Sequence, residues 1–150
     1  MTKRSYEQLE CPIARSLSVL GDQWTLMIVR DALMGIRRFE GFQKSLCISR
    51  NLLTRRLLHL VAEGLLTKEK IHGSRRYEYC PTQKCKDLLG VLLAFSEWGE
   101  QWCPDPGGPL VHIRHTDSGK SVGMRPVMLD KGIEISLGEV ELAHLREKDS

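Results

Sequence analysis

The sequence predicts a mainly α-helical protein with a small β component, and three observations carry that prediction. Apolar residues recur at helical spacing through most of the chain up to Glu63, and again between Thr82 and Trp102. Between these stretches, the alternation of residue types has a period of two, which is typical of paired strands. After the second helical stretch, short apolar runs are separated by turns that contain Gly and Asp.

The length of 150 residues is enough for one domain with an appendage and a buried core. We expect a domain at 1–102, a linker at 103–109 with the sequence CPDPGGP, and a short β-rich appendage at 110–150. No run of about 18 apolar residues occurs, so no membrane contact is predicted. The start MTKRSYEQLECPIA lacks the apolar core of a signal peptide, and we therefore expect a cytoplasmic protein.

The first two helices are separated by a short break. Pro12–Leu20 has apolar residues at helical spacing, and Gly21-Asp22 interrupts the pattern. The pattern resumes over Trp24–Leu33, and Gly35 ends this second helix. A third, short helix is expected over RRFEGFQKSL, where two phenylalanines and a leucine share one face.

A fourth helix is expected from Ser49, its N-cap, to about Glu63, with Gly64 as its stop. Three leucines form its apolar stripe: Leu53, Leu57 and Leu60. The opposite side carries only cations, amides and hydroxyls in the first two turns, namely Arg50, Asn51, Thr54 and Arg55. This face is suited to an anionic partner that also offers hydrogen-bond donors and acceptors along an exposed edge.

The segments LLTKEKI and RRYEYC predict two strands joined by His72-Gly73-Ser74, with Arg75 and Arg76 on the exit side of the turn. Thr82 is expected to cap one long helix that ends near Trp102. This helix is apolar nearly all round, so it needs a second covering surface, and the same helix of another subunit is the economical choice. The residues predicted for this homodimer interface are Leu88, Leu92, Phe95 and Trp98. In the appendage, LVHIRH, SVGMRPVML and IEISLGEVEL predict short strands.

Charge is distributed unevenly along the chain. Between Arg37 and Lys86 there are twelve Lys and Arg against four acidic residues, a net charge of +8. Because the whole chain has a net charge of +3, the remainder carries −5. A basic segment in an otherwise acidic chain indicates a polyanionic partner.

Three helices, a capped basic helix, a basic hairpin and a closing helix together predict a winged helix-turn-helix. Such a helix fits the major groove of DNA, where Arg pairs with guanine and Asn with adenine. The hairpin can reach the minor groove or the phosphates, and the N-terminus of the basic helix can also contact phosphate. We therefore predict double-stranded DNA as the partner. The predicted contact residues are Arg38, as a phosphate clamp, with Ser49, Arg50, Asn51, Thr54, Arg55, Arg75 and Arg76.

The ordered motifs CPIARSLSVLGDQWTLMIVRDAL, RRFEGFQKSL, ISRNLLTRRLLHLVAEGLL, RRYEY and LLAFSEWGEQW resemble those of the HxlR-type bacterial transcription regulators. The resemblance covers Cys11–Trp102. It implies a homodimer that binds operator DNA and regulates nearby genes. It also implies that Cys11 matches the N-terminal cysteine with which some members sense oxidants or electrophiles.

Several alternatives stay open. Cys11 precedes a helix start, where the dipole favours the thiolate and Glu10 opposes it, so it is either a sensor or a structural thiol. Arg56 lies near the leucine stripe and is expected either to contact DNA or to form an internal ion pair, for example with an acid of the third helix. A second function is a winged-helix module for protein partners that does not bind DNA directly, although the face free of apolar anchors argues against it.

Enzymatic chemistry has little support in the sequence. The five cysteines form no C-x-x-C motif, and no histidine stands in a motif with any of them. Cys80 and Cys85 with His72 are a weak zinc pattern, because a second spaced pair is lacking. We predict no catalytic residues, no metal and no cofactor. The operator, the direction of regulation and any small-molecule inducer cannot be read from the sequence.

Overall fold

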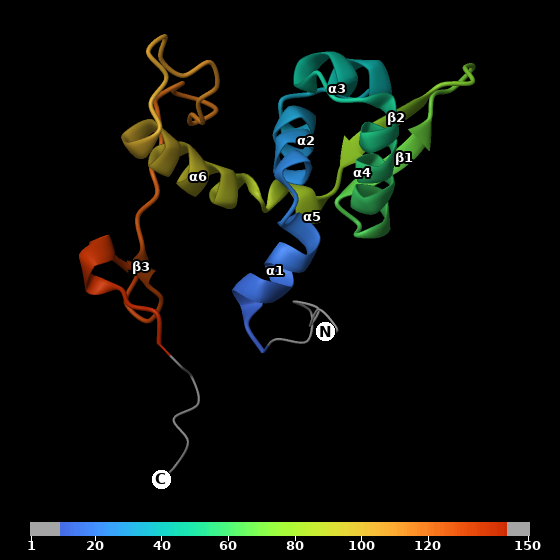
Figure 1. The fold of residues 1–150 in the computed structure, drawn as a ribbon. Helices are drawn as coiled ribbons and strands as arrows, with labels where there is room; N and C mark the ends of the chain where they lie inside the picture. The colour runs from blue at the N-terminus through green and yellow to red at the C-terminus, as the bar shows by residue number, and fades with distance from the viewer. Residues whose placement is uncertain (1–9, 144–150) are drawn as a thin grey trace. The chain divides into compact units, whose positions relative to one another are not determined.

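The computed structural model describes residues 10–143, whose contacts group them into one unit that ends at Leu92 and another that begins at Leu93. The first unit holds the first four predicted helices and the hairpin (Figure 1). No helix within the described residues is long and apolar enough to cross a lipid bilayer. The boundary that the sequence predicts at residue 102 stays a prediction.

The first two helices form where the sequence predicts them. Helix α1 spans Pro12–Leu20 and α2 spans Gln23–Leu33. Asp22 caps α2, because its carboxylate accepts a hydrogen bond of 2.9 Å from the backbone N–H of Trp24. Gly21, the C-cap of α1, and Asp22, the N-cap of α2, define the break between the two helices.

Helices α3 and α4 follow as a helix-turn-helix pair. Helix α3 spans Phe39–Leu46 and α4 spans Arg50–Ala62. Cys47 takes the left-handed conformation with φ of 50°, which turns the chain sharply between them. Ser49 is the N-cap, as predicted, and its hydroxyl accepts from the N–H of Leu52 at 3.3 Å.

The core of the first unit lies where α2, α3 and α4 meet the hairpin. The leucine stripe of α4 is 0–1% exposed, which confirms its predicted inward orientation. Phe42 from α3 is fully buried and meets Tyr79 edge-on, with 6.4 Å between ring centroids. The buried cluster consists of Ile28, Val29, Ala32, Phe42, Leu46, Ile48, Leu53, Leu57, Leu60, Leu65, Leu66 and Cys85.

Strand β1 spans Leu66–Lys70 and pairs antiparallel with β2, Tyr77–Pro81. Figure 1 shows the hairpin beside α4, with its tip projecting outward. The chain before α3 adds to this sheet, because the N–H of Tyr79 donates to the carbonyl of Arg37 at 2.7 Å. The hairpin is thereby tied to the helix-turn-helix on which it is carried.

The prediction of a single long helix after Thr82 is wrong. Two helices are present, α5 over Gln83–Lys86 and α6 over Leu89–Trp102. The N–H of Leu88 bonds to the carbonyl of Cys85 at 3.0 Å, three residues back, which tightens the chain and interrupts the helix. Fully buried Cys85 anchors α5 in the core, whereas α6 has no buried residue in this single chain.

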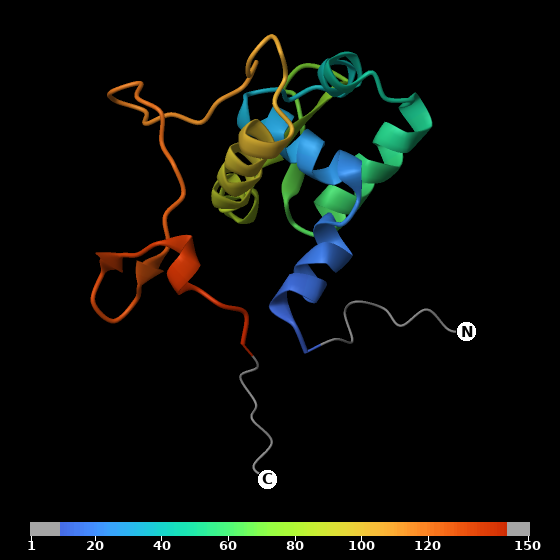
Figure 2. The ribbon, with the colours of Figure 1, turned by 60° about the vertical axis from the view of Figure 1, so that its left-hand side comes forward.

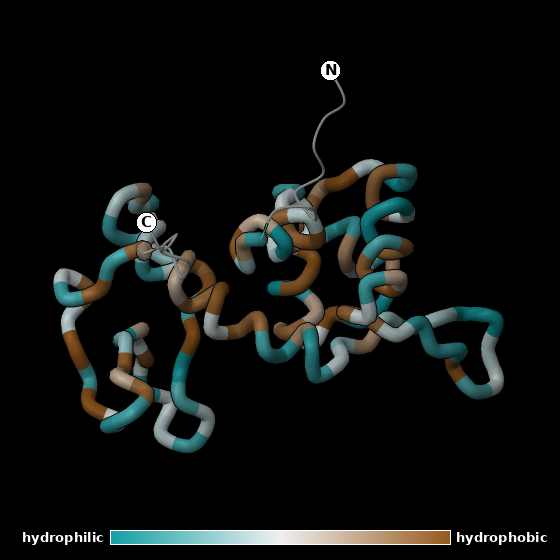
Figure 3. Tube along the Cα trace, turned by 90° about the horizontal axis from the view of Figure 1, so that it is seen from below, coloured by the Kyte–Doolittle hydropathy of each residue, from teal (hydrophilic) through white to brown (hydrophobic). Residues whose placement is uncertain are grey.

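The appendage contains far less strand than the sequence predicts. It has β3 at Val127–Met128, β4 at Ile133–Glu134 and a 3-10 helix, η2, at Leu137–Glu139. LVHIRH contributes only an isolated bridge, and the rest is irregular chain (Figure 2). Hydrophobic residues are spread along this trace in Figure 3, and none of those described is buried. Without a packed face, alternation of residue types is not enough to extend strands.

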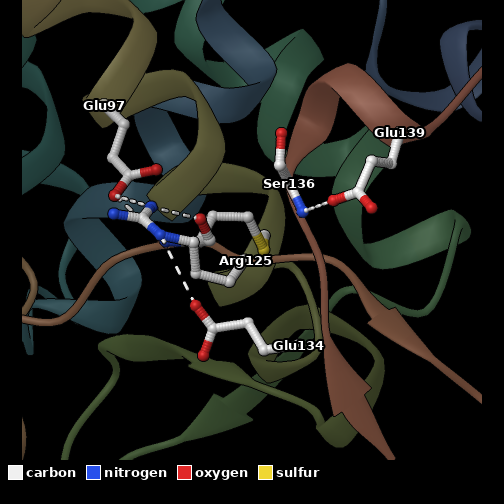
Figure 4. A network of polar contacts seen from close by, with 6 residues as sticks. Glu97, Arg125, Glu134, Ser136 and Glu139 are labelled. Carbon is white, nitrogen blue, oxygen red and sulfur yellow. Dashed lines mark hydrogen bonds and ion pairs between the residues drawn. The ribbon is translucent and has the colours of Figure 1, made fainter.

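Polar contacts organise the second unit instead of a core (Figure 4). The Glu97 carboxylate accepts from the N–H of Met124 at 3.0 Å, and Arg125 lies 3.8 Å from Glu97 and 3.7 Å from Glu134. The start of η2 is closed by a capping box between Ser136 and Glu139.

Arg56 forms the internal ion pair that the sequence left as one alternative. Its guanidinium lies 2.7 Å from the carboxylate of Asp22. The acid therefore belongs to the cap of α2, and the suggested partner in α3 is wrong. Asp22 thus both caps α2 and links it to α4.

Replacing Asp22 should measurably destabilise the protein. We expect Asp22→Ala to lower the free energy of unfolding by about 1–3 kcal/mol, because a helix cap and a half-buried ion pair are lost together. Asp22→Asn is the matched control, since asparagine can cap the helix but carries no charge, and it should lose about 1 kcal/mol or less. Urea unfolding followed by circular dichroism measures both. Equal losses for the two variants would contradict the capping role.

Candidate nucleic-acid interface

The exposed side of α4 carries the residues that the sequence assigns to base contacts. Asn51, Thr54 and Arg55 are exposed, while the leucines on the other side are buried in the core. The Thr54 hydroxyl donates to the carbonyl of Arg50 at 2.8 Å, so its methyl group and oxygen lone pairs are left for a partner. This face therefore offers an amide, a guanidinium and a small mixed group at helical spacing.

The N-terminal end of α4 joins the helix to α3. The Arg50 guanidinium lies over the ring of Phe39, 4.8 Å from its centroid, and the side chain is held there by a cation–π contact. Ser49 uses its hydroxyl to cap the helix. Backbone N–H groups in the first turn of a helix have no intrahelical partner, and together with the helix dipole they favour an anion at this end.

Arg38 lies at the N-cap of α3 and has a neighbour that the sequence analysis did not identify. Its Nε is 3.7 Å from the carboxylate of Glu78 on β2, and its side chain is 46% exposed. An exposed pair at this distance contributes little, so a phosphate can compete with it. No sequence signal indicates the pair, because forty positions separate residues that only the fold brings together.

The tip of the hairpin carries further cations, in addition to those of α4 and Arg38. Gly73 has φ of 72° and allows the tight turn, and the N–H of Arg76 donates to the hydroxyl of Ser74 at 3.1 Å. Arg75 and Arg76 are both exposed. Lys68 adds a cation that was not predicted, with its ammonium 4.6 Å from the ring centroid of Tyr77.

The residues predicted for the homodimer interface divide into two groups. Leu88 and Leu92 are partly buried against the core of the first unit. Phe95 and Trp98 are 59% and 61% exposed and lie on one side of α6. The same side carries two further exposed apolar residues, Val91 and Trp102.

All five cysteines have free thiols. Cys11 is partly exposed at the N-cap of α1 and makes no side-chain cap, while Cys47 and Cys103 are exposed. Burial raises the pKa of the Cys85 thiol above its usual value, and the charge of Arg37 opposes this rise. Among residues 10–143 no group of three or more His, Cys, Asp or Glu could hold a metal ion.

Thiol reactivity should follow this difference in exposure. We expect iodoacetamide at about pH 8 to label Cys47 and Cys103 first and Cys85 last, because a buried thiol with a raised pKa is seldom a thiolate. Peptide mass mapping over time gives the order. Full unfolding in urea should bring Cys85 to the rate of the others, and early labelling of Cys85 in the folded protein would contradict its burial.

The fold and the cationic face of α4 define a winged helix-turn-helix transcription regulator. The chain belongs to the HxlR-like helix-turn-helix family, whose model matches residues 19–106. It is similar to the HTH-type transcriptional regulator Rv3095 of Mycobacterium tuberculosis, with 33% identity over 129 residues, 85% of this chain and 82% of that protein.

Solved structures show the same fold. PA1607, a protein assigned to the transcription factors, has a TM-score of 0.82 at 35% identity, over 93% of this chain and 98% of that one. The redox regulator HypR in its oxidized form has a TM-score of 0.56 at 30% identity, over 61% of this chain and 96% of that one. The first similarity extends into the appendage, beyond the part that the family model matches.

Proposed function

We propose that two copies of the chain bind a pseudo-palindromic DNA operator, each copy placing α4 in a major groove. The observation that supports this most strongly is the exposure of Asn51, Thr54 and Arg55 in the first two turns of α4, opposite the fully buried leucine stripe. A helix held rigidly on its apolar side presents its other side in a fixed orientation, which base recognition needs. Acting on chromosomal DNA, the protein works in the cytoplasm.

Three side chains on this face read bases in the proposal. Arg55 donates to a guanine edge, Asn51 pairs with an adenine edge, and the methyl group of Thr54 contacts a thymine methyl. Arg50 lies at the start of the helix over Phe39, where it can reach either a base or a phosphate.

Other residues hold the protein on the phosphate backbone. The first turn of α4, capped by Ser49, accepts one phosphate at its N-terminus. Arg38 exchanges its weak pairing with Glu78 for a second phosphate. Arg75 and Arg76 at the hairpin tip reach the neighbouring minor groove or its phosphates.

The homodimer forms through the uncovered apolar side of α6. Phe95, Trp98 and Trp102 are between 59% and 68% exposed in the single chain. Large exposed aromatic residues on one helical side are costly in water and typical of subunit interfaces. Symmetry between the subunits then sets half-sites about one helical turn, ~34 Å, apart.

The test is a gel-shift titration with the DNA upstream of the protein's own gene. We expect the affinity for this fragment to exceed that for random DNA of equal length, and to fall steeply as salt rises, because cations on the protein displace counterions from phosphates. Equal affinity for both fragments at every salt concentration would contradict sequence-specific recognition.

We also propose that Cys11 responds to oxidants or electrophiles. Its thiol is partly exposed at the N-terminus of a helix, and one relative of similar fold is described as a redox regulator. An oxidant that removes two electrons and two protons would join Cys11 to Cys103 or to the partner's Cys11, and so change the distance between the two recognition helices. An electrophile would instead add bulk to the thiol.

Cys11→Ser tests this proposal. Diamide or methylglyoxal should weaken operator binding by wild type and leave the variant unchanged, when both are titrated with the same fragment. If wild type is unaffected, or if the variant responds equally, Cys11 is a structural thiol.

A further inference from the structure

A groove in the first unit lies under α1 and is separate from the DNA-binding face described above. One face of α1 lines it with Pro12, Arg15, Ser16 and Val19, which follow one another at helical spacing. Leu20, Leu65, Lys84 and Leu88 complete the lining, and the volume is about 360 Å³. This size lies at the lower end of the range for sites that bind small molecules.

The groove combines an apolar floor with cations. Leu65 is 2% exposed, and Val19, Leu20 and Leu88 pack against the core beneath it. Arg15 and Lys84 are exposed, and no acidic side chain is among the described residues that line the groove. An apolar molecule with one negative group matches this lining, because its chain covers the leucines while Arg15 and Lys84 bind its charge.

Lys84 connects the groove to the end of α4. Its ammonium donates to the carbonyl of Glu63 at 2.5 Å, and Glu63 is the C-cap of α4. Next to this contact, the Thr82 hydroxyl donates to the carbonyl of Gly64 at 2.7 Å. An anion in the groove that draws the ammonium away from this carbonyl removes a contact at the C-terminal end of α4.

We infer that this groove is an effector site for a small amphipathic carboxylate, and that its occupation weakens DNA binding through Lys84. The inference rests on the proposed DNA-binding function, since it names the regulation of that activity. The carboxylate is the ligand class because a planar anion suits the guanidinium of Arg15 and the ammonium of Lys84 together.

Calorimetry of the full chain with octanoate, octanamide and octylamine tests the ligand class. Octanoate should bind saturably, and the amide and amine about tenfold more weakly or not at all, because neither carries a negative charge. Arg15→Gln and Lys84→Gln should each weaken octanoate binding about tenfold. Lys86→Gln on the same short helix lies outside the groove lining and should bind octanoate as wild type does.

The second readout is the affinity for operator DNA with and without octanoate. Octanoate should lower it about fivefold or more in wild type and leave Lys84→Gln unaffected. Absence of octanoate binding, equal binding of the amide, or an unchanged DNA affinity would overturn the inference. The proposed function stands if the ligand-free protein still selects its operator, and fails separately if it does not.

One further outcome would show that the groove is filled by a second copy of the chain and not by a small molecule. If Arg15→Gln or Lys84→Gln changes the sedimentation coefficient while octanoate does not bind, a second copy of the chain fills the groove and the effector site is overturned. Ser16→Phe provides an independent check, because a bulky ring at the rim should block octanoate without removing either cation.

Discussion

Phe95→Glu should convert the dimer into a folded monomer. Phe95 is 59% exposed in the single chain, so the substitution leaves the core of the first unit intact. In the proposed dimer the same position is covered, and burying an unpaired carboxylate there costs several kcal/mol. This loss of dimer stability is large enough to favour the monomer at the protein concentrations used in solution experiments.

Sedimentation velocity measures the result, with circular dichroism as a check on folding. Glu100→Lys is a matched control, because it also changes the charge of an exposed residue on α6 but lies on the opposite side of the helix. It should leave the dimer intact. A Phe95→Glu dimer with an unchanged sedimentation coefficient would place the interface elsewhere. Leu92 is less useful for this test, because it packs against the core and its replacement also threatens folding.

Arg55→Ala should lose specificity as well as affinity. The lost bidentate contact to guanine corresponds to about 1–3 kcal/mol on the operator, while binding to random DNA changes little. Arg75→Ala at the hairpin tip removes a phosphate contact instead, and should weaken both kinds of DNA by similar factors. Fluorescence anisotropy with operator and random duplexes of equal length measures the two ratios.

The neighbouring residue Arg56 provides a control for the Arg55 variant. Arg56 is held by Asp22 at 2.7 Å, whereas Arg55 is exposed and forms no ion pair among the described residues. Arg56→Ala is therefore expected to lower the free energy of unfolding and to keep the ratio of operator to random affinity. If Arg55→Ala reduces both affinities equally, its assigned role in base reading is wrong.

Local patterns in the sequence were sufficient to predict the helix-turn-helix and the hairpin. The stripe formed by Leu53, Leu57 and Leu60 has only one orientation that removes it from water, and this orientation places Asn51 and Arg55 outside. Asp22 and Ser49 cap their helices through contacts within three residues, which neighbouring sequence alone can specify. The polar face of α4 was therefore predictable.

The tertiary structure decided what depends on residues far apart in the chain. The pairs Arg56–Asp22 and Arg38–Glu78 join different elements, and burial of Cys85 anchors the short α5 that precedes the break before α6. In the appendage, the alternating apolar residues predicted longer strands than the structure contains. No packed surface covers them, and only two strands of two residues each form. Helical periodicity and caps are local, but an ion-pair partner, an interrupted helix and a strand's extent depend on what packs against them.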